Sequence, residues 1–481
     1  MPELISHRIK SSFDVRMPLI IVGGGGCGLV AALAASDLGV DTLILERDPK
    51  LWGTTSMSTG LIPAAGMPEQ AAKGIEDSPE LLVLDVLKKT RGEVDRALVK
   101  RLAEQSADTV QWLQATHQVA LSHIDDFLYP GHSAMRMFGM PNRSGAELMA
   151  ALEAAAHKAG ISILTEARVT SLFVEDDVIS GVRIERPDGT AEEIGCDALI
   201  LACCGFAGNP QMVKAFMPEL EFATFHGHPG NEGHAVLWGQ ALGAELKDMH
   251  SYQGHGGLAH GHAIPILWPL IMEGGYQVNR QGTRFSDESL GYSEQAVKVL
   301  AQEGHVAWSI FDARLYDLMM RFDDFQQAVA AGAILEGKTL AELAVVCGLE
   351  ANALESTDAL VNLAKQGVAS DPFGRDFYGK PSLAAPFYAA KVTGALFHTQ
   401  GGLQVDEHAR VIGADGNPMK NLYAGGGAAR GISGPGCDGY MAGNGLLTAT
   451  TLGKLAGRHA ASQLNRRADY GDDQSKVDDR L

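Results

Sequence analysis

Two apolar runs, separated by a glycine-rich turn and an alanine-rich segment, occupy residues 19–46 and restrict the possible folds. The first run, Leu19–Val22, is typical of a buried parallel strand. Gly23, Gly25 and Gly28 follow in a G-x-G-x-x-G spacing, ahead of a predicted helix that reaches about Leu38. The first glycine allows a tight turn, the second lets backbone approach a pyrophosphate, and the third lets helix pack close to strand. This spacing predicts a strand–turn–helix unit that binds a dinucleotide.

A second strand and an acidic residue complete this unit. Gly39 ends the predicted helix, Thr42–Leu45 forms the second strand, and Glu46 follows it. An acid roughly 20 residues past such glycines can accept hydrogen bonds from a ribose. The free N–H groups and the positive dipole at the helix N-terminus suit phosphates. The alternative is a glycine-rich turn without a ligand, but the two strands, the helix and the acid together favour dinucleotide binding.

The charge balance limits the partners of the chain. With 39 basic and 58 acidic residues the net charge is −19, which argues against nucleic acid and against anionic membrane surfaces. The N-terminus lacks the apolar core of a signal peptide, and no apolar run of about 18 residues is present to span a membrane. The lack of both segments predicts a cytoplasmic protein. The length of 481 residues predicts two or three domains.

None of the six cysteines lies in a C-x-x-C spacing, which indicates reduced thiols in a cytosolic protein. No C-x-x-C-H is present, so no c-type haem is expected. The cysteines are Cys27, Cys196, Cys203, Cys204, Cys347 and Cys437.

Further predicted elements suggest a sheet that is assembled from distant segments. They are a helix at Gly145–His157, strands at Ser162–Thr165 and Val169–Val174, a hairpin of Gly181–Arg186 with Ala191–Ile194, a buried strand at Asp197–Ala202, a turn at Asp415–Pro418, a strand at Asn421–Ala424, and a final helix from about Gly443 to Ala461.

Residues 211–385 differ in composition, with more aromatics, histidines and amphipathic helix, and are predicted to form an inserted cap domain. The nucleotide-binding domain is then discontinuous, comprising residues 17–210 and 386–465. Residues 1–16 and 466–481 are predicted tails, and the charged tail after about Arg466 is expected to be disordered.

Several motifs resemble the fumarate reductase/3-ketosteroid dehydrogenase family of FAD enzymes, over roughly residues 17–460. They are Gly53–Ser56 with Ser58–Gly60, Val278–Glu288, His398–Leu403 and the segment 424–447. The resemblance implies an α/β fold: a Rossmann-like FAD-binding domain with an inserted α+β substrate or capping domain. It places FAD extended along the first domain and the flavin ring between the two, with substrate above it. The glycine unit alone could serve NAD; segments 53–60 and 424–447 favour FAD.

The same resemblance supplies a set of FAD contacts. In covalently flavinylated relatives a histidine stands at about the position of Gly53, so the FAD is expected to be non-covalent. The N-terminus of the final helix would stabilise negative charge on the flavin pyrimidine. The implied contacts are Gly23, Gly25, Gly26, Cys27, Gly28, Glu46, Arg47, Thr54, Thr55, Ser56, Ser58, Thr59, Gly60, Val169, Cys203, Gly205, Tyr423, Gly425, Gly426, Asn444, Leu446 and Leu447.

The chain departs from fumarate reductases at the positions that hold substrate. Their proton-donating arginine, four residues after the glutamate Glu288, is replaced by Tyr292. Their carboxylate-binding arginine is replaced by Tyr440, and a histidine is replaced by Phe397, although His398 is adjacent. Leaving two buried carboxylates without such partners costs several kcal/mol each. The departures argue against fumarate as substrate.

The same replacements resemble the ketosteroid branch, where a tyrosine follows the glutamate and a G-Y-x-x-G segment, here Gly439–Gly443, precedes the last helix. Desaturating a ketone needs a polarised carbonyl, removal of an α-proton, and transfer of a β-hydride to flavin N5. We expect Tyr292 to accept the proton, and Tyr440 with the Gly443 N–H to polarise the carbonyl. The alternative is that Tyr292 packs on a cap helix and Tyr440 packs in the core beside the flavin.

Other candidates are weaker. His132, Arg136, His398 and Gly402 are possible substrate contacts, and Arg136, Arg143 or Arg430 could bind one substrate carboxylate. The histidine-rich stretch His250–His262 has irregular spacings without acidic or cysteine neighbours, so we predict a flexible, substrate-lining glycine loop and no metal. Segments 376–378 and 431–436 are also predicted to be loops that shape the pocket.

The sequence therefore predicts an FAD-dependent dehydrogenase that desaturates a cyclic or steroid-like ketone and passes electrons to an external acceptor. A reductase of an activated C=C bond is the alternative, because the same flavin site serves both directions. A flavin-binding partner subunit without its own substrate is a minor alternative. The small-molecule partner is then a ketone or an enone.

Overall fold

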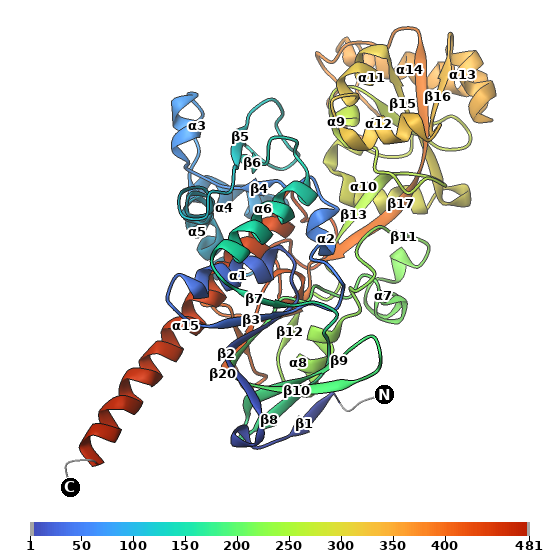
Figure 1. Ribbon diagram of the computed structural model, residues 1–481. Helices are drawn as coiled ribbons and strands as arrows, with labels where there is room; N and C mark the ends of the chain where they lie inside the picture. The colour runs from blue at the N-terminus through green and yellow to red at the C-terminus, as the bar shows by residue number, and fades with distance from the viewer. Residues whose placement is uncertain (1–3, 479–481) are drawn as a thin grey trace. The chain divides into compact units, whose positions relative to one another are not determined.

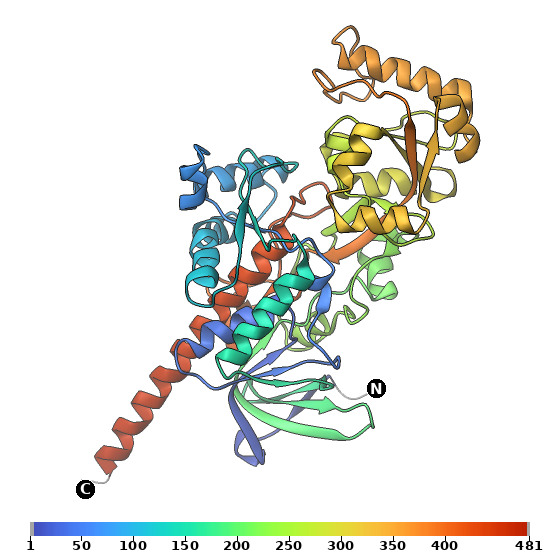
Figure 2. The same cartoon turned by 45° about the horizontal axis from the view of Figure 1, so that its top comes forward.

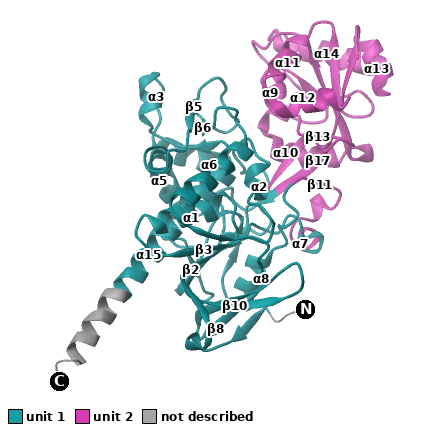
Figure 3. Ribbon diagram, in the orientation of Figure 1, with its two compact units in different colours: residues 1–212, 227–251, 398–481 teal, residues 213–226, 252–397 magenta. Residues whose placement is uncertain are grey.

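The computed structural model describes residues 4–478, and side chains up to residue 467 (Figure 1). The chain divides into two compact units, shown in different colours in Figure 3. Unit 1 comprises residues 1–212, 227–251 and 398–481, and unit 2 comprises residues 213–226 and 252–397. Helix α7 (Pro210–Phe216) and strand β17 (Phe387–Thr399) run across the boundaries.

Unit 1 contains a nine-stranded sheet, two smaller sheets and the helices around them. Its elements are β1 (Ile5–His7), η1 (Lys10–Ser12), β2 (Val15–Val22), α1 (Gly26–Ser36), β3 (Thr42–Leu45), α2 (Gly53–Ser56), β4 (Ile62–Pro63), α3 (Pro68–Ala72), α4 (Pro79–Lys89), α5 (Arg96–Ala115), β5 (Ser122–Ile124), β6 (Met137–Gly139), α6 (Gly145–Lys158), β7 (Ser162–Leu164), β8 (Arg168–Glu175), β9 (Val178–Glu185), β10 (Ala191–Leu201), α8 (His234–Ala241), β12 (Leu246–Lys247), β18 (Gly402–Leu403), β19 (Arg410–Ile412), β20 (Pro418–Ala424), η5 (Gly426–Ala428) and α15 (Asn444–Asp478).

The centre of the large sheet is parallel, in the order β7, β3, β2, β10, β20. The second half of β10 lies between β2 and β20, whereas its first half pairs antiparallel with β9, which pairs with β8. The predicted hairpin strand and the strand Asp197–Ala202 are thus one continuous strand. The mixed α/β architecture with a central parallel sheet agrees with the predicted fold class.

Helices α1 and α15 lie side by side in both views (Figures 1 and 2). Glycines on α15 allow this close approach. A Cβ at Gly453 would lie 2.6 Å from the Cys27 carbonyl oxygen, and one at Gly457 would lie 2.1 Å from the Ala31 carbonyl oxygen. The residues of α1 from Gly26 to Ala35 are buried, which explains why its sequence is apolar on all sides. The start of α15 is therefore fixed against the nucleotide-binding unit.

Both ends of the chain differ from the prediction or lie beyond what is described. The sequence predicts a tail over residues 1–16, but β1 pairs in parallel with β8, and β2 begins at Val15. Helix α15 continues past the predicted end at Ala461. The C-terminal tail falls largely on residues whose side chains lie outside the described part, so its disorder stays a prediction.

Unit 2 is built on a six-stranded sheet in which β17 pairs with β11, β13, β15 and β16, and β15 pairs with β14. Its elements are η2 (Pro218–Leu220), β11 (Thr224–Phe225), β13 (Tyr252–Ala259), α9 (Pro269–Met272), β14 (Tyr276–Val278), η3 (Glu288–Leu290), α10 (Tyr292–Leu300), η4 (Glu303–His305), β15 (Val306–Asp312), α11 (Ala313–Met319), α12 (Asp323–Ala330), β16 (Ile334–Gly337), α13 (Leu340–Cys347) and α14 (Ala351–Lys365).

The histidine-rich stretch forms strand β13 and not a flexible loop. Its glycines allow α10 to pack against it, because a Cβ at Gly254 would lie 2.8 Å from the Ala296 Cβ, and one at Gly256 would lie 2.7 Å from the Gln295 carbonyl carbon. The glycine content that suggests a loop in the sequence is thus a packing requirement.

Residues 227–251 belong to unit 1, although the sequence places them in the cap. They include α8 and β12, and β12 pairs antiparallel with β18. Conversely, residues 386–397 belong to unit 2, because most of β17 is part of its sheet. Within residues 4–478, no helix is both long and apolar enough to cross a membrane.

Candidate functional site

The turn between β2 and α1 has the geometry that its glycines predict. Gly23 has φ +106°, and a Cβ there would lie 2.6 Å from the Ala202 carbonyl oxygen. A Cβ at Gly28 would lie 1.9 Å from the Gly23 carbonyl oxygen, so only glycine lets α1 pack this close to the strand. A Cβ at Gly25, by contrast, would have no atom within 4 Å, because this residue faces open space. This is where a pyrophosphate could approach the backbone.

Glu46 follows β3 and is held in place by backbone N–H groups. Its carboxylate accepts hydrogen bonds from Gly24 N–H at 2.8 Å and from Asp48 N–H at 3.0 Å. Burial raises the pKa of Glu46, and the two N–H bonds oppose that effect. Because a carboxylate has about four acceptor positions, capacity is left for ribose hydroxyls.

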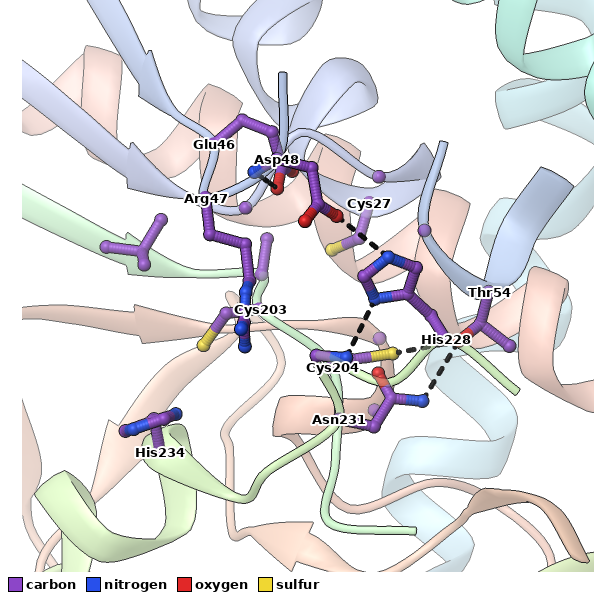
Figure 4. A pocket seen from close by; sticks show the side chains of 18 of the residues that line it. Cys27, Glu46, Arg47, Asp48, Thr54, Cys203, Cys204, His228, Asn231 and His234 are labelled. Carbon is purple, nitrogen blue, oxygen red and sulfur yellow. Dashed lines mark hydrogen bonds and ion pairs between the residues drawn. The ribbon is translucent and has the colours of Figure 1, made fainter. Parts of the chain in front are cut away.

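A pocket of about 870 Å³, including its open mouth, lies over this turn within unit 1 (Figure 4). Eleven of the predicted cofactor residues line it: Gly23, Gly25, Gly26, Cys27, Glu46, Arg47, Thr54, Thr55, Val169, Cys203 and Gly426. The structure thus brings together residues that are up to four hundred positions apart in the chain.

Five further lining residues come from segment 227–251, which the sequence places in the cap: His228, Gly230, Asn231, His234 and Trp238. The His228 Nε2 lies 2.7 Å from an Asp48 oxygen, and the Asn231 amide donates to Thr54 Oγ1 at 3.0 Å (Figure 4). A glycine-rich turn before a helix is the sequence signal that could have assigned this segment to the pocket. Gly233 has φ +85° and directly precedes α8.

The other predicted cofactor residues do not line this pocket: Gly28, Ser56, Ser58, Thr59, Gly60, Gly205, Tyr423, Gly425, Asn444, Leu446 and Leu447. Two of them have packing roles. The Tyr423 hydroxyl lies 3.0 Å from His459 Nδ1 in the core, and Gly425 packs against the sulfur of Cys27. Gly402, a predicted substrate contact, is buried in the strand pair of β18 with β12.

Neutral hydrogen-bonding groups gather at the start of α15. Tyr440 is buried, its hydroxyl accepts the Gly445 N–H, and burial raises its pKa well above the ordinary value. The His398 ring lies edge-on to Tyr440, with 5.7 Å between ring centroids. Burial lowers the pKa of His398 to about 4, against a smaller opposing effect of the Thr399 carbonyl. Both side chains are therefore uncharged at neutral pH.

A chain of buried hydrogen bonds connects His398 to the first residue of α15. Asn444 donates to Ser433 Oγ at 3.1 Å, and Ser433 donates to Gln400 Oε1 at 2.7 Å. The Gln400 amide nitrogen lies 3.3 Å from His398 Nδ1. The Asn444 Oδ1 atom is buried without a hydrogen-bond partner among the described residues. An unmet buried acceptor at a helix start suits an N–H donor of a ligand.

The arginines proposed to bind a substrate carboxylate are paired with protein carboxylates instead. Arg136 is fully buried and bonds Asp77 at 2.8 and 3.0 Å and Asp85 at 2.6 Å. This pairing differs from the prediction that Arg136 contacts the substrate. The sequence pattern does not reveal the two acids that bind it. Likewise Arg143 pairs with Asp126, and Arg430 with Asp95 and Asp248.

Tyr292 begins α10 in unit 2 and packs in an aromatic cluster. Its ring stacks on His255 with centroids 5.2 Å apart, and His255 stacks on Phe397 at 5.1 Å. Trp268 lies edge-on to both His255 and Tyr292. Burial lowers the pKa of His255 to about 3, so its imidazole is uncharged at neutral pH.

No group of three or more His, Cys, Asp or Glu side chains placed to hold a metal ion occurs in the part of the chain that the structure describes. The six cysteines are free thiols.

Comparison with known proteins places these features in context. A family model described as "FAD binding domain" matches residues 19–446. A probable fumarate reductase of Shewanella frigidimarina is 29% identical over 466 residues, covering 95% of this chain and 77% of that protein. A 3-oxosteroid 1-dehydrogenase of Mycobacterium tuberculosis is 25% identical, covering 95% and 99%. The open conformation of a flavocytochrome c3 fumarate reductase superposes with a TM-score of 0.79 at 27% identity, covering 94% and 79%.

Proposed function

The chain belongs to the FAD-binding domain family, and on that basis we propose that it desaturates a neutral cyclic or steroid-like ketone at the α,β bond. It is an FAD-dependent oxidoreductase that acts on CH–CH bonds, related to both fumarate reductases and 3-oxosteroid dehydrogenases. The substrate class, the direction and an external electron acceptor are the proposed part.

The residues present fit FAD. The open face of Gly25 accommodates a pyrophosphate, and Glu46 retains capacity for a ribose. Asn444 Oδ1, which has no partner among the described residues, would be available as an acceptor for the imide N–H of a flavin. When bound, FAD supplies the two-electron acceptor for a hydride from the β-carbon.

One observation carries the choice of a ketone: the groups at the start of α15 are neutral donors. Tyr440 is a protonated phenol, His398 is an uncharged imidazole, and the Gly443 N–H is a backbone donor. Neutral donors of this kind stabilise the oxyanion of an enolate. Two substrate carboxylates would instead need paired cations. The candidate arginines Arg136 and Arg430 are each bound by two acids.

In the proposed reaction, Tyr440 and the Gly443 N–H hold the carbonyl oxygen, and Tyr292, which the family resemblance assigns as the base, takes the α-proton as a phenolate. Tyr440 suits the donor role because its raised pKa keeps it protonated. The C–H bond at the α-carbon breaks and gives its proton to Tyr292, and the C–H bond at the β-carbon breaks and gives its hydride to the flavin. A C=C bond forms between the two carbons, and the substrate loses two electrons. An external acceptor then reoxidises the enzyme.

A reductase of an activated C=C bond is the second candidate. The observation that favours it is the higher identity to a protein described as a fumarate reductase, 29%, against 25% for the 3-oxosteroid dehydrogenase. The two candidates differ in the charge of the substrate as well as in direction.

Anaerobic mixing separates these functions. We expect cyclohexanone or a saturated 3-oxosteroid to bleach the long-wavelength flavin band of the purified protein, and succinate to leave it unchanged. Dithionite-reduced protein should be reoxidised by 2-cyclohexenone and not by fumarate. Reoxidation by fumarate alone would overturn the ketone proposal in favour of the reductase, and no response to any compound would overturn both.

We also expect FAD to be released when the protein is precipitated with acid. Gly53, at the position of the histidine of covalently flavinylated relatives, has no side chain and has φ +54°. The pocket histidines His228 and His234 are engaged with Asp48 and Glu232. Yellow colour should therefore appear in the supernatant. Colour that stays with washed, denatured protein would show a covalent bond.

A further inference from the structure

A buried polar relay ends on the peptide bond just before α15. Arg136 Nη1 donates to Asp85 at 2.6 Å and lies 3.3 Å from His132 Nδ1. His132 Nε2 lies 2.9 Å from the Ala442 carbonyl oxygen. Arg136 is 1% exposed and His132 is 6% exposed, so solvent does not compete for these bonds. All of these residues belong to unit 1.

The relay fixes the tautomer of His132. Arginine has only donors, so Nδ1 must accept from Arg136 and the ring proton must be on Nε2, where it is donated to the Ala442 carbonyl. Burial, and next the positive charge of Arg136, lower the pKa of His132 to about 4. The imidazole is thus neutral and its single N–H is directed at one acceptor.

Holding that carbonyl also sets the direction of the Gly443 N–H. Peptide groups are planar, and in a trans peptide the C=O and the following N–H point in opposite directions. The one cis peptide among the described residues is Ala385–Pro386, so Ala442–Gly443 is trans. With its carbonyl bound to His132, this peptide points the Gly443 N–H away from the relay. No acceptor for that N–H occurs among the hydrogen bonds of the described residues.

Gly443 itself is constrained at this orientation. It has φ +81°, and a Cβ there would lie 2.6 Å from the Pro63 ring. Its own carbonyl accepts the Leu447 N–H and begins the hydrogen bonding of α15. Glycine makes this conformation accessible, but it also makes the peptide easy to rotate, because glycine tolerates many backbone angles. A separate contact is needed to hold the N–H in one direction, and His132 supplies it.

We propose that His132 is a positioning residue, which holds the Ala442 carbonyl so that the Gly443 N–H is preorganised to bind the oxyanion of the substrate. The inference rests on the proposed function, since it assigns a purpose to the donor that polarises the carbonyl. Preorganised donors are effective because they need no reorientation when charge develops. Asp77 and Asp85 contribute by anchoring Arg136, which in turn orients the imidazole.

A matched pair of amide variants tests this role in the holoenzyme. In His132→Gln the side-chain nitrogen can occupy the place of Nε2 and reach the Ala442 carbonyl. In His132→Asn the amide reaches only the place of Nδ1. Both variants are polar and smaller than histidine, so both should fold and bind flavin alike. We expect His132→Asn to lower kcat for the ketone about 10- to 100-fold, less than the roughly 100- to 1,000-fold loss for deleting a donor outright, and His132→Gln to restore most of it.

Fluorine NMR of bound 4-fluorophenol provides a readout that a purely structural role would not change. The phenolate mimics the enolate, so the wild-type site should lower the pKa of the bound phenol, and His132→Asn should return it toward the free value. Equal kcat and equal phenol pKa in the two variants and the wild type would overturn the positioning role while leaving the proposed function intact. If wild-type protein neither reacts with ketones nor shifts the phenol pKa, the proposed function fails first and this inference falls with it.

Discussion

Replacing Tyr440 with phenylalanine is expected to lower kcat for the ketone about 100- to 1,000-fold, or roughly 2.7–4 kcal/mol of transition-state stabilisation. The hydroxyl is buried and accepts the Gly445 N–H, which orients the phenol. Its raised pKa keeps the proton on the oxygen at neutral pH, so it acts as a donor to a developing enolate. Phenylalanine keeps the ring against His398 but removes that donor.

The kinetic pattern of this variant is informative. Because the bond to the oxyanion strengthens in the transition state, kcat and kcat/KM should fall together while substrate binding changes little. Flavin content should stay at the wild-type level, because the dinucleotide pocket does not include Tyr440. Wild-type kcat in Tyr440→Phe would contradict the assignment of Tyr440 as a carbonyl-binding residue.

Tyr276→Phe is a matched control for this measurement. Tyr276 is also fully buried, and its hydroxyl donates to Asp358 at 3.0 Å, but it lies in the core of unit 2. The same substitution therefore deletes one buried hydroxyl and one hydrogen bond. We expect a loss of stability of about 1 kcal/mol and unchanged turnover per bound flavin.

The part of the site that the sequence predicts well is the part that is encoded locally. The strand, glycine turn, helix and acid of residues 19–46 lie next to one another in the chain, so spacing alone predicts their arrangement. The open face of Gly25 and the tight packing of Gly28 follow from the same spacing. The family resemblance extended this prediction to FAD, and the match over residues 19–446 confirms it.

Residues whose roles depend on distant partners were not predicted. Arg136 appears in the sequence as an isolated cation, but Asp77 and Asp85, which bind it, are 59 and 51 residues away. Segment 227–251 contributes to the dinucleotide pocket, and its strand β12 pairs with β18, about 150 residues later. Composition cannot show such pairings.

The glycines of β13 show why residue propensity alone did not predict this strand. Glycine is depleted in strands and enriched in loops, so a histidine- and glycine-rich stretch suggests a loop. Here the missing side chains make room for α10, which packs on the strand. The propensity was overridden by a tertiary contact, and the position of Tyr292 at the start of α10 depends on that same contact.

Glu288→Gln is expected to destabilise unit 2 by about 3–5 kcal/mol, because it breaks a buried ion cluster on one side. Glu288 is fully buried and bonds Arg284 at 2.8 and 2.9 Å and Arg375 at 2.9 Å. Arg284 also pairs with the buried Asp371, so the cluster holds two positive and two negative charges. Glutamine preserves the shape but leaves one positive charge without compensation.

The contribution of Glu288 to the stability of unit 2 depends on pH. Burial by itself would raise the pKa of Glu288, but Arg375, Arg284 and the Gln277 N–H outweigh it, and the pKa is lowered overall. A group with a depressed folded-state pKa contributes stability above its unfolded pKa, about 4.3 for glutamate, and loses that contribution as pH falls through the folded value. The difference between wild type and Glu288→Gln should therefore be largest near neutral pH and shrink in acid.

Urea unfolding measures this change when tryptophan fluorescence is compared with the flavin band, which reports on the pocket of unit 1. Trp268 and Trp308 are buried in unit 2, and Trp52, Trp112 and Trp238 belong to unit 1, so the fluorescence change that the flavin band does not follow is assigned to unit 2. Glu303→Gln is the matched control: Glu303 pairs with Arg280 at 3.1 Å on the surface of the same unit, where such pairs contribute about 0–1 kcal/mol. Equal tryptophan midpoints for the two variants would show that the buried cluster does not stabilise the fold. A shift confined to Glu288→Gln, and lost in acid, would identify Glu288 as the charge that holds Arg284 and Arg375 in the interior of unit 2.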